Sequence, residues 1–199
     1  GKDLRPEKDG LFDEKITGGM DGTRWSHFKL SEAMPNPLFE DAIRKITGLK
    51  EREYREIVSG KKKVKGKTGG EAIEALLKDI DVKKARKATR KQIDSTRGER
   101  RSALHKKLRI LKALDEQDLD PTVYMMRSVP ILPPKFRPMV VKDDGNISSN
   151  DLNGLYKDVG AVNDLLKRNK KAGIPDDHLS DMRMELYDGL KALTGTGGS

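Results

Sequence analysis

The segment from Val129 to Pro138, VPILPPKFRP, decides how this chain is organised. Four of its ten residues are proline, which restricts φ and lacks a backbone donor, so no helix or central strand is expected to cross it. Residues that precede a proline also favour extended backbone. The segment therefore predicts a stiff, extended strap, with Ile131, Leu132 and Phe136 as its apolar anchors.

The composition around this strap is rich in charge and poor in large apolar side chains. Of the 199 residues, 37% are charged, 34% are hydrophobic and 5% are aromatic. These proportions leave little material for a thick core and disfavour a β-sandwich with an aromatic interior. We predict an elongated, mainly α fold with small β elements.

The balance of charges and the cysteine count limit which functions the protein can have. Lys and Arg number 41 against 32 acidic residues, a net charge of +9, which favours nucleic acid as a partner but is also typical of a basic protein kept soluble by its charge. The absence of cysteine excludes disulfides, thiolate catalysis and cysteine zinc sites, and with three histidines we expect no metal site. No apolar run reaches membrane-spanning length and no signal peptide is visible, so we expect a soluble, intracellular protein without a membrane partner.

The residues before the strap change character several times. Residues 1–24 have loop chemistry, the alternation in Trp25–Leu30 predicts a short strand, and Ile43 and Ile46 share one helical face. The basic stretch 60–70, GKKKVKGKTGG, contains Gly-Lys-Thr but lacks the first glycine and the preceding strand of a Walker-type loop. We interpret it as a solvated loop able to touch phosphate.

A densely basic helical region follows, from residue 82 to residue 114. Asp81 is placed to cap its first helix, and Gly98 is expected to divide it into two. The region reads either as a ridge facing nucleic acid or as the solvated face of a helical pair. A run of charge by itself slightly favours the solvated face.

After the strap, Met139–Ser149 has the signature of a protruding β-loop. Asp144 and Gly145 form a tight-turn signal between Val140–Val141 and Ile147. Basic residues beside such a turn can hold phosphates without reading sequence. The predicted nucleic-acid-binding residues are Arg137, Lys142, Asn146 and Ile147.

The last long segment, residues 150–193, predicts two antiparallel helices. Apolar residues recur at three-and-four spacing on both sides of a Gly173–Pro175 turn. At 1.5 Å per residue the first helix extends roughly 30 Å, which indicates a hairpin that projects from the body and serves as a docking post. Its predicted partner-binding residues are Asn153, Tyr156, Asn163, Lys167, Arg168 and Arg183.

The order of these motifs resembles the N-terminal part of the β′ subunit of bacterial-type multisubunit RNA polymerase. The resemblance rests on LRPEKDGLF, WSHFKL followed by PNPLF, GGEAIEALLKDID, LHKKLRILKAL, VPILPPKFRP and SSNDLNGLYKDV. It runs from about Leu4 to Leu193 and is strongest in the strap and in the NDLNGLY that follows.

The resemblance implies that different segments of the chain have different roles. Residues 1–128 correspond to a clamp body, 129–149 to a strap and lid loop, 150–193 to a clamp coiled coil and 194–199 to a tail. In the family, the lid helps part RNA from template DNA at the upstream end of the hybrid, and the coiled coil docks the promoter-recognition (sigma) factor. The implied partners are other polymerase subunits, especially β and the remainder of β′, a sigma-like factor, template DNA and the RNA:DNA hybrid.

Two departures from the family pattern stand out. The family usually carries a four-cysteine zinc module where this chain has only TGGMDGTR, residues 17–24. A basic residue important for sigma docking in the family aligns with Val162. Both changes favour a divergent, virus-encoded polymerase over a reduced cellular lineage, with the cytoplasm of a bacterium or of an infected host as its location.

The family's catalytic aspartate-rich motif, which holds Mg²⁺, does not occur in this chain. We therefore expect a piece of a nucleotidyltransferase subunit that catalyses nothing itself and holds no cofactor. Two alternatives remain: a free-standing basic helical module that binds nucleic acid, and a module that captures a transcription factor. Binding to phosphates would weaken steeply with salt, whereas apolar docking on the hairpin would not.

Overall fold

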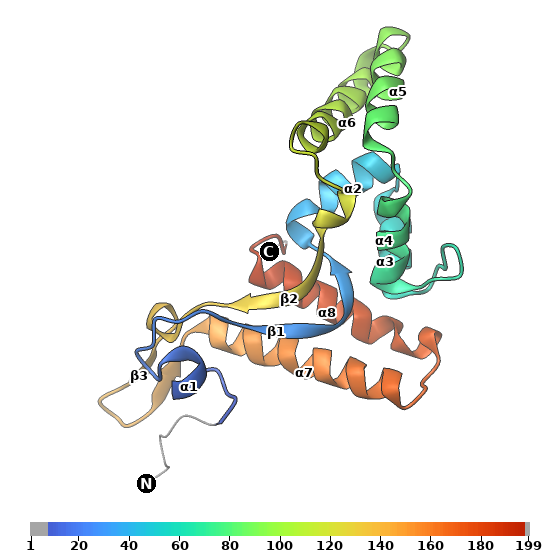
Figure 1. Ribbon diagram of the computed structural model, residues 1–199. Coiled ribbons are helices and arrows are strands. Elements are labelled where there is room, and N and C mark those ends of the chain that lie inside the picture. Colours follow the sequence, from blue (N-terminus) through green and yellow to red (C-terminus); the bar gives the residue numbers. More distant parts are fainter. Residues whose placement is uncertain (1–7, 198–199) are drawn as a thin grey trace.

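Helices dominate the fold of residues 8–197, which the computed structural model describes (Figure 1). Two small two-stranded antiparallel sheets complete this part of the chain, so the prediction of a mainly α fold with small β elements is confirmed. Residues 1–7, with the start of the expected body and of the LRPEKDGLF match, lie outside the described residues, as do residues 198–199 of the expected tail.

The elements follow one another in a simple order. The helices are α1 Glu14–Thr17, α2 Glu40–Thr47, α3 Glu51–Ser59, α4 Gly69–Lys78, α5 Val82–Asp94, α6 Gly98–Glu116, α7 Asp151–Lys171 and α8 Ser180–Leu193. The strands are β1 Ser26–Pro35, β2 Met125–Ile131, β3 Met139–Val141 and β4 Ile147–Ser149. Short 3-10 helices are η1 Pro37–Phe39, η2 Pro121–Tyr124, η3 Pro134–Phe136 and η4 Asp176–Leu179.

The ribbon of β1 and β2 runs through the middle of the molecule. Its register pairs Ser26 with Ile131 and Pro35 with Met125, with an irregularity between Lys29 and Met34. The strand predicted at residues 25–30 therefore continues to Pro35. The first residues of the strap also belong to a strand, which crosses the boundary expected after residue 128. A two-stranded sheet has only edge strands, where the missing donor of a proline is tolerated.

The apolar core lies where α2, α3, α4, α7 and α8 surround β1. The sequence analysis missed α3, whose Tyr54, Ile57 and Val58 are fully buried. The Tyr187 hydroxyl donates to Glu40 at 2.6 Å and lies 2.8 Å from the Tyr54 hydroxyl, which therefore donates to it. Burial is the main cause of the raised pKa of both phenols. These hydrogen bonds satisfy the polar atoms that α3 and α8 bring into the core.

The basic helices α5 and α6 form a pair that extends away from the sheet and the core (Figure 1). As predicted, the Asp81 side chain caps α5 by accepting from the Lys84 amide at 2.9 Å, and Gly98, with a φ of +64°, begins α6. Few apolar side chains of the pair are buried: Ile93 on α5, and Leu111 and Leu114 on α6, which belong to the main core. Most of the surface of the pair is therefore open.

The C-terminal helices α7 and α8 are antiparallel neighbours, but they do not project from the body. Helix α7 packs along β1, and α8 packs against α3 and η1 (Figure 1). Gly173, with a φ of +76°, follows the end of α7 as predicted. The body covers one face of α7 and α8, and this face carries both polar and apolar side chains. The helical pair that extends from the body is instead α5–α6.

A glycine at the contact between α4 and β1 gives a stability prediction. A Cβ atom at Gly70 would lie 1.6 Å from the carbonyl oxygen of Ala33, so the two backbones could not stay in contact. We expect Gly70→Ala to lower the free energy of unfolding by about 2 kcal/mol or more in urea denaturation.

The matched control for this substitution is Gly160→Ala in α7, where an added Cβ atom meets nothing within 4 Å. This change should raise the free energy of unfolding by roughly 0.5–1 kcal/mol, through helix propensity alone. Equal effects of the two substitutions would contradict the close approach of α4 to β1.

Candidate functional site

The β3–β4 hairpin is the most exposed ordered element near the strap. Its register pairs Met139 with Ser149 and Val141 with Ile147. The turn closes through hydrogen bonds from the Lys142 amide to Asn146 and from the Gly145 amide to Lys142, both of 2.8 Å. This confirms the predicted β-loop.

One face of this hairpin is apolar and lacks a covering partner in the described chain. Val141 and Ile147 lie directly opposite each other, and their exposed fractions are 59% and 45%. Of this pair, the sequence predicted only Ile147 as a nucleic-acid-binding residue, although the register set by the Asp-Gly turn places Val141 opposite it. Lys142 and Asn146 are exposed beside them, as predicted, and Asn146 donates to the Asp144 carboxylate at 2.9 Å.

Arg137 does not belong to this exposed surface, which corrects its prediction as a phosphate ligand. Its side chain is fully buried: Nε donates to the Leu132 carbonyl at 2.6 Å, Nη1 donates to Asn153 Oδ1 at 3.0 Å, and Nη2 donates to the Leu11 carbonyl. Its guanidinium also lies 4.8 Å from the centre of the Phe12 ring. Arg137 therefore joins the strap to α7 and to the N-terminal segment, and burial lowers its pKa.

The strap uses different anchors from those expected. Ile131 is buried and Leu132 is partly buried, in line with the prediction, but the Phe136 ring is 61% exposed. Arg137 takes the interior position instead, because backbone carbonyls and Asn153 meet its hydrogen-bonding capacity there. A buried guanidinium without such partners would be strongly unfavourable.

Most of the residues expected to meet a partner on α7 are also buried. Asn163 accepts from the Ser31 amide at 2.7 Å and donates to the Lys29 carbonyl at 2.9 Å, next to the irregularity in β1. The Tyr156 hydroxyl accepts from the Leu132 amide at 3.0 Å, and Asn153 donates to the Arg137 carbonyl. Asn163 thus satisfies backbone groups of β1, and Tyr156 and Asn153 satisfy backbone groups of the strap. Asn153, Tyr156 and Asn163 are thus structural, and the expectation that Asn153 and Asn163 are free is wrong.

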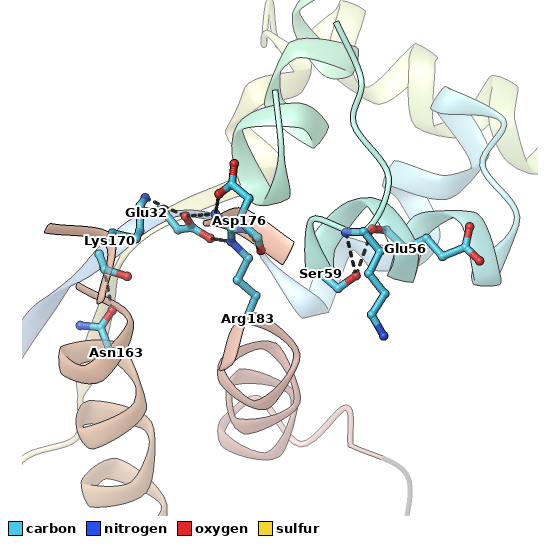
Figure 2. Close-up of polar contacts among 9 residues, drawn as sticks. Glu32, Glu56, Ser59, Asn163, Lys170, Asp176 and Arg183 are labelled. Carbon is cyan, nitrogen blue, oxygen red and sulfur yellow. Dashed lines mark hydrogen bonds and ion pairs between the residues drawn. The ribbon is translucent and has the colours of Figure 1, made fainter. Parts of the chain in front are cut away.

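Arg183 lies in a buried ionic cluster (Figure 2). Its Nε is 2.8 Å from Glu32 Oε1, and its Nη2 is 2.9 Å from Asp176 Oδ1. Lys170 Nζ is 2.8 Å from the other oxygen of Glu32, and the hydrogen bond from Arg183 holds the pKa of Asp176 below its usual range. Arg183 therefore cannot meet a partner, and only Lys167 and Arg168 of the predicted set are exposed.

Positive charge gathers on α5 and α6 rather than on the hairpin α7–α8. Residues 82–116, which form α5 and α6, contain thirteen Lys and Arg against four acidic residues, a net +9 that equals the net charge of the whole chain. The exposed basic residues of this pair are Lys83, Lys84, Lys87, Arg90, Lys91, Arg97, Arg100, Arg101, Lys106, Arg109 and Lys112. This surface can contact phosphates.

Glycines form a tight turn in residues 17–24, the stretch directly before β1. The Gly22 amide donates to Gly19 and the Arg24 amide donates to Thr17, directly before β1. A Cβ atom at Gly22 would lie 1.9 Å from the Thr17 carbonyl oxygen, so the turn needs glycine there. The Gly22 carbonyl also accepts from the Lys135 amide of the strap at 3.0 Å. A short hydrogen-bonded turn thus contacts the strap.

Neither a metal site nor a membrane-spanning helix is present in the described part of the chain. Within residues 8–197, no three His, Asp or Glu side chains come together in a way that could hold a metal ion. None of the helices in this part of the chain combines the length and the apolar character needed to cross a membrane.

Comparison with known proteins points to one family. Residues 50–188 match the family model described as RNA polymerase Rpb1, domain 1. The chain is 35% identical over 129 residues to the DNA-directed RNA polymerase subunit beta′ of Geobacillus kaustophilus, which covers 65% of this chain and 11% of that protein.

Two other relatives agree. Identity is 36% over 129 residues to the DNA-directed RNA polymerase subunit gamma of a Synechococcus species, covering 65% of this chain and 21% of that protein. It is 31% over 150 residues to the subunit beta′ of Caldicellulosiruptor saccharolyticus, covering 75% of this chain and 13% of that protein. The chain thus spans 11% to 21% of the length of these three relatives. It belongs to the RNA polymerase Rpb1 domain 1 family, as a counterpart of the N-terminal region of the bacterial β′ subunit.

Proposed function

We propose that this chain is the clamp and lid region of a DNA-directed RNA polymerase β′ subunit. The observation that carries the proposal is the β3–β4 hairpin, in which the apolar pair Val141–Ile147 beside the turn is exposed while Arg137 is buried close to the base of the hairpin. A wedge between nucleic-acid strands needs both features. Its tip must offer apolar surface to the bases, and its base must resist the force of the strands.

The hairpin suits a separating role that is independent of sequence. Val141 and Ile147 can pack against an unpaired base, and Lys142 can hold a backbone phosphate beside them. In the complete enzyme, this hairpin would keep RNA apart from template DNA at the upstream end of the hybrid.

The helices α7 and α8 are the proposed docking site of a promoter-recognition factor, and the remainder of β′ and the β subunit are the proposed neighbours. Lys167 and Arg168 are the residues of the predicted set that stay available for such a partner. The catalytic Mg²⁺ and the chemistry of nucleotidyl transfer would belong to the rest of the polymerase. A virus-encoded enzyme remains our proposal for the source, because the short turn at residues 17–24 replaces the zinc module.

Direct binding of nucleic acid by the chain itself is favoured by the charge on α5 and α6. This pair extends from the body (Figure 1), and residues 82–116 carry a net charge of +9, as large as that of the whole chain. Such a surface attracts any duplex through phosphate contacts. It would also support the alternative of a free-standing nucleic-acid-binding module.

Replacing the apolar pair Val141–Ile147 tests the proposed role of the hairpin as a lid. In a polymerase assembled with this chain, Val141→Ser plus Ile147→Ser should leave nascent RNA paired with the template, because nothing apolar then covers the separating bases. The measurement is the sensitivity of the transcript to RNase H, which should increase severalfold. Val140→Ser, on the opposite face of the same strand, is the control and should change little. Unchanged sensitivity in the double variant would refute the wedge.

Replacing Arg137 separates its structural role from phosphate binding. Arg137→Met removes the donors to three buried or partly buried acceptors, and we expect the free energy of unfolding to fall by roughly 3 kcal/mol. Lys142→Met, at an exposed site, should change it by less than about 0.5 kcal/mol. Urea denaturation of both variants provides the comparison, and equal stability would show that Arg137 is not the anchor of the strap.

Binding of duplex DNA tests the α5–α6 surface. Lys87→Gln, Arg90→Gln and Lys91→Gln together should weaken binding. The slope of log K against log salt should also become shallower, by roughly 0.9 for each phosphate that the variant no longer neutralises. The control is Lys167→Gln, Arg168→Gln and Lys171→Gln, which removes the same charge from exposed sites on α7. If the two triple variants bind DNA equally weakly, net charge and not this surface governs binding.

A further inference from the structure

A groove of about 530 Å³ lies between α7 and α8 on the side that the body leaves open. Its floor is apolar and is formed by Leu155, Val159 and Val162 of α7 and by Met184 and Gly189 of α8. The helices approach closely here, since a Cβ atom at Gly189 would lie 2.7 Å from Val159 Cγ2. Leu155, Val162 and Met184 are only partly buried, so apolar surface stays accessible to a partner.

The rim of the groove is acidic on both sides. Asp158 stands on α7, and Asp181, Glu185 and Asp188 stand on α8 at intervals of four and three residues, which places them on one face of that helix over roughly 10 Å. All four carboxylates are exposed, and the groove has no basic lining residue. One end is partly neutralised, because Arg55 Nη2 lies 3.6 Å from Asp188 Oδ2.

This acidic rim contrasts with the charge of the chain as a whole. The net charge is +9, so a general attraction would favour acidic partners. The groove instead favours a basic partner, because its four carboxylates surround an apolar floor. Val162, which lies on this floor, supplies no charge. The basic residues of α5 and α6 lie away from α7 and α8 (Figure 1), and the exposed Lys167, Arg168 and Lys171 of α7 do not line the groove.

We propose that this groove binds a basic amphipathic helix of a partner protein. The apolar face of that helix would enter the floor between α7 and α8, and Lys or Arg spaced by three and four residues would meet the carboxylates on the rims. The inference rests on the proposed docking role of this hairpin and specifies the chemistry of the partner. It also places the contact on a face different from the buried Asn153, Asn163 and Arg183.

Two labelled helical peptides with the same leucine spacing test the proposal against the 199-residue chain. One peptide carries lysine beside the leucines and the other carries glutamate. The lysine peptide should bind at least about tenfold more tightly in fluorescence anisotropy, although the chain is net positive. Equal binding of the two peptides, or tighter binding of the glutamate peptide, would overturn the proposal.

Charge reversal then locates the site. Asp181→Lys plus Glu185→Lys should weaken the binding of the lysine peptide by about tenfold and strengthen that of the glutamate peptide. Asp164→Lys plus Asp177→Lys makes the same change in net charge at exposed sites outside the groove and should have little effect. Circular dichroism checks that each variant is folded, and an unaltered affinity of the folded groove variant would exclude this groove.

The peptide-binding experiments test the groove separately from the role of the chain in transcription. If the lysine peptide binds in the groove but the assembled polymerase recruits its promoter-recognition factor equally well in the Asp181→Lys plus Glu185→Lys variant, the docking function fails and the groove inference stands. A second copy of this chain could also offer the basic α5–α6 pair. If the chain dimerises as its concentration increases, and the lysine peptide abolishes the dimer, the groove binds that second copy and not a separate partner protein.

Discussion

The buried ion pair between Glu32 and Arg183 joins the sheet to the C-terminal hairpin. Both side chains are almost wholly shielded from water, at 3% and 2% exposed, and lie 2.8 Å apart. Removing two charges from water is costly, and the cost is recovered only where each charge has further partners. Lys170 and Asp176 provide them, so that the cluster is neutral and joins β1, α7, η4 and α8. Breaking either side would leave an uncompensated charge inside the protein.

The same rule governs the rest of the contact between α7 and the strands. A two-stranded sheet and an irregular strap leave backbone groups without partners, and polar side chains of α7 supply those partners. Asn163 pairs with Ser31 and Lys29, and Asn153 and Tyr156 hydrogen-bond to residues of the strap. The hairpin therefore lies against the body and does not project from it. The strap is held at its end, and the short β3–β4 hairpin beyond it is the part left exposed.

The division of charge follows from this arrangement. The positive charge of the chain gathers on α5 and α6, which bury few apolar side chains. The accessible side of α7 and α8 carries acidic residues around an apolar groove. Two surfaces of opposite character thus lie on different helical pairs, one suited to phosphates and one suited to a basic helix. Both proposals depend on this separation and not on the net charge.

Local chemistry was enough to predict several features from the sequence alone. The Asp-Gly turn between β3 and β4, the Asp81 cap of α5, the break at Gly98 and the end of α7 before Gly173 all depend on neighbouring residues and backbone preference. The family was recognisable for a related reason, since its motifs are short and occur in order.

Tertiary structure alone decided which side chains are buried. Phe136 is exposed while its neighbour Arg137 is buried, the reverse of what their polarity indicates. The hydrogen bond between Ser31 and Asn163 joins residues 132 positions apart, and that between Arg137 and Leu11 joins residues 126 apart. No local pattern encodes such partners. A polar side chain becomes structural only when distant backbone groups come within hydrogen-bonding distance, and that depends on how the helices pack against the sheet.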